Sequence, residues 1–195
     1  MAKFYAVKAG RKPGIYLSWD ECRKQVDKFK GAVYKSFNSE DEARAFIEEK
    51  TVDLDNGLIA YVDGSYNIKT KEYGFGCVII EGQRIIKEMY GKGNDINYVS
   101  MRNVAGEILG SICAMEYAKN SGHTQICIYY DYEGIEKWAD GLWKANKIGT
   151  QEYQKKVAMY RKVLEIAFVK VLAHSGDFYN ERADKLAKKA VGLNG

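Results

Sequence analysis

Leu58-Ile59-Ala60-Tyr61-Val62-Asp63-Gly64-Ser65 is an apolar run that leads directly into an aspartate and a glycine. Its first five residues, which are apolar or aromatic, predict a buried strand. A carboxylate at the end of such a strand is costly to keep charged unless a cation lies beside it. Asp-Gly is also common in turns, so Asp63 could equally cap a turn. Three further acidic residues in comparable settings favour the first interpretation.

The chain after this strand predicts an α/β fold. Runs of strand-like composition alternate with segments whose apolar residues recur at helical spacing. Together with residues 58–62, the expected strands are 73–80, 84–90, 125–130 and 168–173, and the expected helices are 100–121, 132–139, 150–167 and 180–191. The order β-β-β-α-β-α-α-β-α predicts a mixed five-stranded sheet flanked by helices.

Residues 1–49 have a separate organisation, with strands expected at 3–8, 15–17 and 32–37. Ser18-x-x-Glu21 and Ser39-x-x-Glu42 are capping boxes that each predict the start of a helix. The result is a small β-β-α-β-α module. Residues 50–57 are polar and short, which is typical of a linker, so we expect domains at 1–49 and 58–195.

The charge of the chain is concentrated near its beginning. The net charge is +4, yet residues 1–37 hold nine basic and three acidic side chains, a local excess of 9 − 3 = +6. Aromatic residues are interleaved with these bases, a combination that suits nucleic acid, although a solvated lysine-rich surface explains the charge equally well. The four cysteines are far apart and form no Cys-x-x-Cys pair, so neither zinc nor disulfides are expected.

The sequence gives no sign of a membrane or an export signal. The chain has no apolar run near the length of a membrane span, and its first residues are too short an apolar run for a signal peptide. We therefore expect a cytoplasmic protein that does not bind membranes. Nothing in the sequence demands an oligomer, so a monomer is expected.

Four carboxylates stand out within the second domain: Asp63 and Asp131 after buried strands, Glu107 in the long helix, and Asp184 in the last helix. Carboxylates that are buried close together cannot all stay ionised without a counter-cation. Oxygen ligands of this kind suit Mg²⁺ or Mn²⁺. Glycoside hydrolysis is the rival interpretation for paired acids, but it needs only two of them and no cation. Four acids beside a basic aromatic module favour a phosphodiester substrate.

The N-terminal module resembles the viroplasmin-like hybrid-binding domain that precedes the catalytic domain of many type 1 ribonucleases H. The resemblance rests on Phe4-Tyr5-Ala6-Val7-Lys8, Gly14-Ile15-Tyr16, Trp19-x-Glu21-Cys22 and Tyr34-Lys35-x-Phe37. It implies that Tyr5, Trp19 and Tyr34 line the DNA strand and that Lys8 and Lys35 contact nucleic acid. Ser36 stands where the family often has a second lysine, which places one phosphate contact in doubt.

The second domain resembles the catalytic domain of type 1 ribonuclease H over residues 58–191. The matching pieces are Tyr61-Val62-Asp63-Gly64-Ser65, Arg102-Asn103-Val104-Ala105-Gly106-Glu107, Tyr129-Tyr130-Asp131 and His174-x9-Asp184. The resemblance implies a ribonuclease H-like sheet, two Mg²⁺ ions (Mn²⁺ as a possible substitute) held by the four carboxylates, and an attacking water activated by one of the ions.

The same resemblance assigns further roles in this domain. His174 would assist proton transfer or product release, although a loop histidine is usually only solvated. Gly64, Ser65 and Asn103 would meet the substrate backbone, and RNA would be recognised through its 2′-hydroxyl groups. Residues 66–71 depart from the glycine- and proline-rich turn of many members, and residues 138–156 are too short to include the basic protruding helix that some members carry.

These observations predict an endonuclease that cleaves the RNA strand of RNA–DNA hybrids and leaves 5′-phosphate and 3′-hydroxyl ends. By resemblance it would remove hybrids during replication and repair, and its N-terminal domain could also bind double-stranded RNA. One alternative is a non-catalytic binder of hybrid or double-stranded RNA with a decayed nuclease domain. Another is a nuclease on the same fold that acts on DNA junctions or transposon ends.

Overall fold

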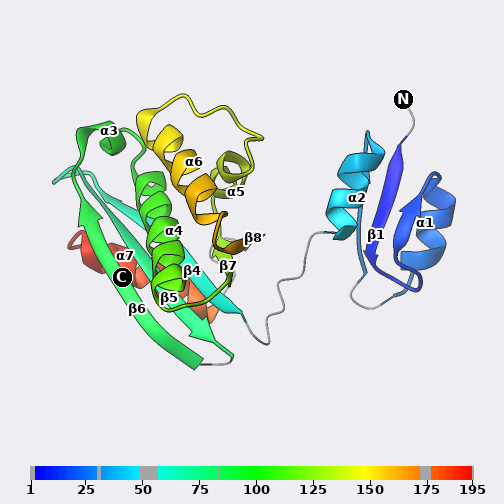
Figure 1. Ribbon diagram of the computed structural model, residues 1–195, viewed down its shortest axis with the longest axis horizontal. Helices are drawn as coiled ribbons and strands as arrows, with labels where there is room; N and C mark the ends of the chain where they lie inside the picture. The colour runs from blue at the N-terminus through cyan, green and yellow to red at the C-terminus, as the bar shows by residue number, and fades with distance from the viewer. Residues whose placement is uncertain (1–2, 30–31, 49–56, 83, 172–176, 195) are drawn as a thin grey trace. The chain divides into compact units, whose positions relative to one another are not determined.

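A computed structural model describes residues 3–29, 32–48, 57–82, 84–171 and 177–194 (Figure 1). The chain divides into two compact units, Met1–Lys50 and Thr51–Gly195. Most of the predicted linker falls at 49–56, outside the described residues, so the domain limits 1–49, 50–57 and 58–195 stay predictions. Among the described residues, no helix is long and apolar enough to cross a membrane.

The first unit has the predicted β-β-α-β-α order: β1 (Phe4–Ala9), β2 (Gly14–Tyr16), α1 (Trp19–Val26), β3 (Val33–Phe37) and α2 (Glu40–Glu48). Its antiparallel sheet has the order β2-β1-β3. Both predicted helix caps form, because the hydroxyl oxygens of Ser18 and Ser39 accept hydrogen bonds from the backbone three residues later. The three side chains of its buried core cluster are Val7, Cys22 and Val26.

The second unit contains the remaining elements in nearly the predicted order: β4 (Leu58–Asn67), β5 (Glu72–Glu81), β6 (Arg84–Gly93), α3 (Ile96–Val99), α4 (Asn103–Asn120), β7 (Gln125–Tyr130), α5 (Gly134–Ala139), α6 (Ile148–Tyr160), β8 (Glu165–Lys170) and α7 (Phe178–Ala190). The short α3 is an addition. The sheet order is β6-β5-β4-β7-β8, with β4, β7 and β8 parallel and β5 and β6 antiparallel to their neighbours. The predicted mixed five-stranded sheet is thus confirmed.

Glycines allow helices to approach both faces of this sheet. A Cβ atom on Gly64 of β4 would lie 2.0 Å from the carbonyl oxygen of Asn103, and one on Gly76 of β5 would lie 2.0 Å from that of Ala183. These positions therefore hold α4 against one face and α7 against the other. Gly106 of α4 continues the first contact, since its Cβ would lie 1.9 Å from the carbonyl oxygen of Gly74.

Three predicted boundaries were wrong. The strand β4 continues through Gly64 to Asn67, because β5 pairs with it along its whole length. The helix α6 ends at Tyr160 instead of continuing to Ala167, and β8 spans Glu165–Lys170 instead of 168–173. Pairing with β7 in register, Ile128 opposite Phe168, draws these residues into the sheet although their apolar spacing also fits a helix.

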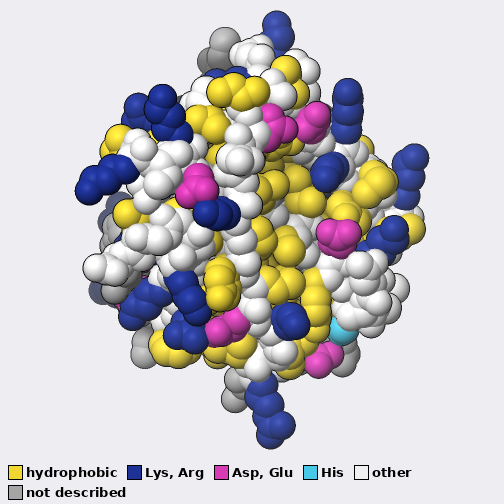
Figure 2. Space-filling model, turned by 90° about the vertical axis from the view of Figure 1, so that its left-hand side faces the viewer, with side chains coloured by type: hydrophobic (Ala, Val, Ile, Leu, Met, Phe, Trp, Pro, Cys, Tyr) yellow, Lys and Arg dark blue, Asp and Glu magenta, His cyan; other side chains and the backbone are white. Residues whose placement is uncertain are grey.

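The strand β6 forms one edge of the sheet and lies on the left in Figure 1. Figure 2 shows the molecule from that left-hand side. Apolar side chains gather in a band down the middle of this face, and lysines and arginines lie around it. Ile85, Ile86 and Tyr90 of β6 are exposed. Charged residues along the strand and a register shift near its start are features that protect an edge strand from pairing with another chain.

Candidate metal centre

Asp63 lies in the middle of β4, not at a strand end or in a turn. The parallel pairing between β4 and β7 stops at Tyr61 opposite Tyr129, so Asp63 lies beyond the last pair. Asp131 follows directly after β7, at the same edge of the sheet. The carboxyl end of β7, which is parallel to β4, thus brings Asp131 beside Asp63. The sequence predicted that these two carboxylates lie together.

Glu107 reaches this edge from the helix α4. Its side chain is fully buried, and its Oε2 accepts a hydrogen bond of 3.3 Å from the backbone N–H of Tyr132. The other oxygen, Oε1, is buried without a hydrogen-bond partner among the described residues. One carboxylate oxygen each from Asp63, Glu107 and Asp131 lies within 4.8 Å of the others. The structure therefore brings three of the four predicted carboxylates into one cluster.

The electrostatics of this cluster are unfavourable for three negative charges. Burial, and after it the charges of Asp131 and Asp184, together raise the pKa of Asp63 to about 7. Burial and the two neighbouring carboxylates also hold the pKa of Glu107 well above its usual range. Such a site is stabilised by protons or by a cation. An unpartnered buried oxygen within a carboxylate cluster fits a hard divalent ion such as Mg²⁺ or Mn²⁺.

The fourth predicted carboxylate, Asp184, lies next to this cluster but outside the group of three. It is on α7, close enough for its charge to act on Asp63. Its Oδ2 accepts a hydrogen bond of 2.7 Å from Nζ of Lys188, one turn later on the same helix. This ion pair was not predicted, although an acidic and a basic residue four positions apart on a helix are a pattern that indicates one.

The predicted substrate-contacting residues of this unit lie beside the carboxylates. Asn103 is exposed at the start of α4, whereas Ser65 is buried in β4. The close contact of Gly64 with Asn103 shows that helix packing alone already requires a glycine there. No observation tests whether these three residues touch nucleic acid, and that role stays a prediction.

A cavity of about 290 Å³ near the carboxylates was missed by the sequence analysis. Its lining includes the aromatic side chains of Tyr132 and Trp138 and two basic ones, Lys144 and Lys147. Tyr132, which follows Asp131 in the chain, also donates its backbone N–H to Glu107. One residue therefore joins the lining of the cavity to the carboxylates. In the sequence, an aromatic and basic site of this kind is indicated by two tryptophans, Trp138 and Trp143, that lie among lysines.

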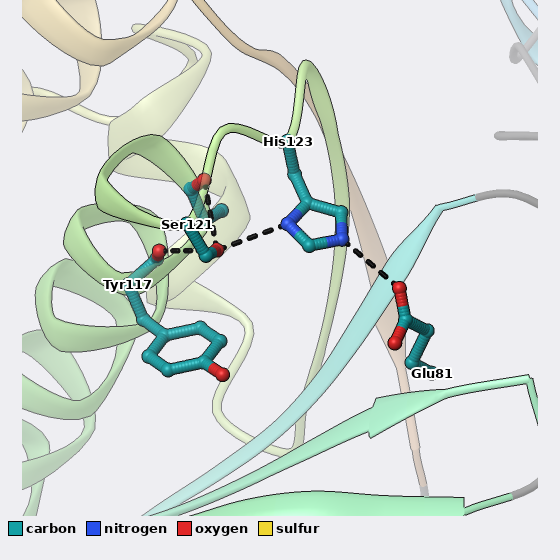
Figure 3. A network of polar contacts seen from close by, with 5 residues as sticks. Glu81, Tyr117, Ser121 and His123 are labelled. Atoms are coloured by element: carbon teal, nitrogen blue, oxygen red, sulfur yellow. Dashed lines mark hydrogen bonds and ion pairs between the residues drawn. The ribbon is translucent and has the colours of Figure 1, made fainter.

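Of the two histidines of the chain, His123 lies within the described residues and His174 does not. The assignment of His174 therefore stays a prediction. His123 lies 2.9 Å from Oγ of Ser121 through Nδ1 and 3.1 Å from Oε1 of Glu81 through Nε2 (Figure 3). Glu81 pairs with Leu58, five residues before Asp63 on β4, which places His123 about 17 Å along the sheet from the carboxylates.

The predicted binding residues of the first unit form an aromatic surface, defined here as Tyr5, Trp19 and Tyr34. The ring of Trp19 lies between the other two, with centroid distances of 5.8 Å and 5.7 Å. Trp19 and Tyr34 are 41% and 45% exposed. Lys35 is exposed and follows Tyr34 in β3, so its side chain points to the other face of that strand, where its Nζ lies 5.5 Å from the ring centroid of Phe37. Lys8 lies in β1. The structure therefore brings the three predicted rings together on one surface.

Comparison with known proteins identifies both units. Residues 55–192, more than half of the chain, match the sequence model of the family described as RNase H. The chain belongs to the ribonuclease H family. Residues 3–47 match the family described as the ribonuclease H1 N-terminal domain. The predicted resemblance is thus confirmed for both parts of the chain.

Two relatives with the name ribonuclease H match this chain over different lengths. Ribonuclease H1 of Homo sapiens is 29% identical, and the alignment covers 96% of this chain and 89% of that one. Ribonuclease H of Syntrophomonas wolfei is 30% identical, and the alignment covers 69% of this chain and 95% of that one.

Two solved structures show the same ribonuclease H-like fold. RNase H1 of the archaeon Halobacterium salinarum, 23% identical, superposes with a TM-score of 0.60 over 70% of this chain and 98% of that one. LC11-RNase H1, solved in complex with an RNA/DNA hybrid, is 22% identical and has a TM-score of 0.58 over 69% of this chain and 96% of that one.

Proposed function

We propose that this protein is a divalent-metal-dependent endonuclease that hydrolyses the RNA strand of RNA–DNA hybrids, leaving 5′-phosphate and 3′-hydroxyl ends. The observation that carries the proposal is the cluster of Asp63, Glu107 and Asp131, in which a buried carboxylate oxygen lacks a partner. Membership of the ribonuclease H family supports the choice of substrate.

The carboxylates are proposed to hold two Mg²⁺ ions, with Mn²⁺ as a substitute. Bound divalent ions supply Lewis acidity at the phosphodiester and lower the pKa of a water molecule. Asp63, Glu107 and Asp131 would provide ligand oxygens, and Asp184 would provide one from α7 once Lys188 releases it. The backbone N–H of Tyr132 orients Glu107, since it binds one oxygen, while the other is buried without a hydrogen-bond partner among the described residues.

The remaining proposed roles concern the substrate. Asn103, Ser65 and the backbone at Gly64 lie beside the carboxylates and would contact the RNA strand there. His174 would assist proton transfer or product release. The cavity lined by Trp138 and the two lysines has the aromatic and cationic character that suits a nucleic-acid backbone.

The N-terminal unit is proposed to hold the hybrid for the catalytic unit. Its aromatic surface can stack on bases or sugars, and Lys35 and Lys8 can meet phosphates. An exposed ring face is sequence-tolerant, so this unit would bind hybrids of any sequence, and double-stranded RNA is a second ligand to be tested.

The deciding experiment compares cleavage of an RNA–DNA hybrid, double-stranded RNA and double-stranded DNA of the same sequence in Mg²⁺, with EDTA as the control. We expect cleavage of the hybrid alone, in its RNA strand, and none in EDTA. Cleavage of double-stranded DNA would indicate a different nuclease on this fold. Binding of the hybrid without cleavage in either Mg²⁺ or Mn²⁺ would identify a non-catalytic binder.

A further inference from the structure

Three tyrosines stack on one another beneath the carboxylates of the second unit. The ring of Tyr61 lies 4.5 Å from that of Tyr129, nearly parallel at 22°, and 5.3 Å from that of Tyr179. Each ring belongs to an element that carries a carboxylate: Tyr61 is on β4, Tyr129 on β7 and Tyr179 on α7. This tyrosine stack therefore links the three elements that bring Asp63, Asp131 and Asp184 together.

The stack lies on the face of the sheet that α7 covers. Side chains two residues apart on a strand point to the same face, so Tyr61 and Asp63 share a face of β4. Tyr61 belongs to a buried cluster with Val78, Ala183 and Leu186, two strand residues and two residues of α7. The ring of Tyr61 is thus packed between the strands and the helix.

Asp177 connects the beginning of α7 to the same tyrosine. Its Oδ1 caps the helix by accepting hydrogen bonds of 2.9 Å and 3.0 Å from the backbone N–H groups of Tyr179 and Asn180. The hydroxyl of Tyr61 lies close to the same carboxylate, and burial together with this carboxylate raises the pKa of that hydroxyl. One side chain therefore fixes the N-terminal end of α7 to β4 at a point two residues before Asp63.

The other end of α7 is fixed to the same strand. Nδ2 of Asn67, the last residue of β4, donates a buried hydrogen bond of 2.9 Å to the carbonyl oxygen of Val191. Asp184 lies between these two attachments, and its own hydrogen bond goes to Lys188 on the same helix. The distance from Asp184 to Asp63 is consequently governed by how α7 as a whole sits on β4.

We propose that Tyr61 and Asp177 are positioning residues that set the affinity of the carboxylate site for divalent cations by fixing α7, and with it Asp184, relative to Asp63. The inference rests on the proposed function, in which Asp184 is a metal ligand. Metal geometry tolerates displacements of only about 0.5 Å, so a loosened helix end weakens binding although no ligand has changed.

The test compares Tyr61→Phe with Tyr98→Phe in the full-length chain. The two tyrosines are matched: they are 8% and 7% exposed, each ring stacks on another tyrosine, and each hydroxyl lies beside a carboxylate, that of Tyr98 beside Glu152. Titration calorimetry measures the Mn²⁺ dissociation constant, and thermal unfolding in EDTA measures stability.

We expect Tyr61→Phe to raise the Mn²⁺ dissociation constant about three- to tenfold, less than the roughly 10- to 100-fold losses seen for partners that bond directly to a ligand, because Tyr61 acts through the helix. Both variants should lower the unfolding temperature by similar amounts. Tyr98→Phe should leave the Mn²⁺ dissociation constant unchanged. Equal Mn²⁺ affinities in the two variants would overturn the inference.

Two substitutions of Asp177 separate positioning from helix capping. Serine and asparagine both cap helices well, but the serine hydroxyl is too short to reach Tyr61 as well. Asp177→Asn should retain most of the Mn²⁺ affinity, and Asp177→Ser should lose as much as Tyr61→Phe, with no further loss when the two are combined. Additive losses would contradict a shared contact. Failure of the wild-type chain to bind Mn²⁺ at all would instead refute the proposed metal centre.

Discussion

The proposed metal centre of the second unit and the aromatic surface of the first are incomplete in opposite ways. At the metal centre, charged groups are buried: Glu107 is fully inaccessible and Asp63 is 9% exposed. On the aromatic surface, apolar groups are left in water, since Trp19 and Tyr34 are both more than one-third exposed. Burial without a counter-charge is costly, and so is exposure of large rings. Each cost points to a partner, a cation in one case and a stacking ligand in the other.

The largest expected effect is the loss of cleavage when the charge of one clustered carboxylate is removed. Asp131→Asn keeps the size of the side chain but should lower the cleavage rate of a saturating hybrid by more than about 100-fold, the upper range for partners outside the coordination sphere. Hybrid affinity, measured by fluorescence anisotropy, should change less than threefold, because the aromatic surface is intact.

Asp140→Asn is the control for this variant. Asp140 is a carboxylate that forms an ion pair with Arg161 and lies outside the cluster of three. Its substitution should leave cleavage within about twofold of the wild type. Full activity of Asp131→Asn, or cleavage by the wild type that EDTA does not diminish, would remove the metal centre from the mechanism.

The second prediction tests the cost of the buried charge directly. A carboxyl group whose pKa is about 7 in the folded chain and about 4 when unfolded favours the folded state below pH 4, and this stabilisation is lost as the pH rises to 7. Three pKa units correspond to about 4 kcal/mol at most. In EDTA at pH 8, Asp63→Asn should therefore raise the free energy of unfolding by roughly 2 kcal/mol, since the amide is still a buried polar group.

Urea unfolding at pH 4 and pH 8 measures this difference. At pH 4 the advantage of Asp63→Asn should nearly vanish, because the wild-type carboxyl group is then protonated in the folded chain. Adding Mg²⁺ at pH 8 should stabilise the wild type and not the variant. A wild type that is more stable than Asp63→Asn in EDTA at pH 8 would show that the cluster is not strained by charge.

The comparison also explains what the sequence could predict. The order of strands and helices followed from apolar spacing, and the four carboxylates were found because each interrupts an apolar setting. The end of β4 was placed too early because Gly64 resembles a turn residue, whereas its role is to admit α4. The end of α6 was placed too late because Leu164 and Ala167 continue helical spacing, although Glu165–Lys170, Ala167 among them, pair with β7.

Contacts between distant segments were beyond the reach of such patterns. Phe29 continues the helical spacing of Cys22 and Val26, yet it is 38% exposed because it follows the end of α1. The stack of Tyr61 on Tyr129 depends on strand register. The ion pair between Lys188 and Asp184 is by contrast local to one helix, and its spacing could have indicated it. A sequence pattern identifies which face a residue occupies but not which side chain meets it there.

The third prediction concerns the first unit as a whole. Deleting residues 1–50 removes the aromatic surface and the local charge excess of +6 within residues 1–37. Hybrid affinity should fall at least tenfold, and the dependence of log K on log salt should become less steep, because fewer counterions are released on binding. Turnover at saturating hybrid should change less than threefold. An unchanged salt slope would show that this unit does not contact the phosphates.

The smallest expected effect separates ring stacking from charge within that unit. Trp19→Ala removes the central ring of the aromatic surface and no charge, so hybrid affinity should fall several-fold, about 1 kcal/mol, at the low end for one stacked base. The salt slope should stay that of the wild type. Phe29→Ala is the matched control, because Phe29 is about as exposed as Trp19 but lies outside the aromatic surface. If the two variants weaken binding equally, the exposed rings act only through stability; if Trp19→Ala instead lowers the salt slope, the ring orients the lysines and does not stack.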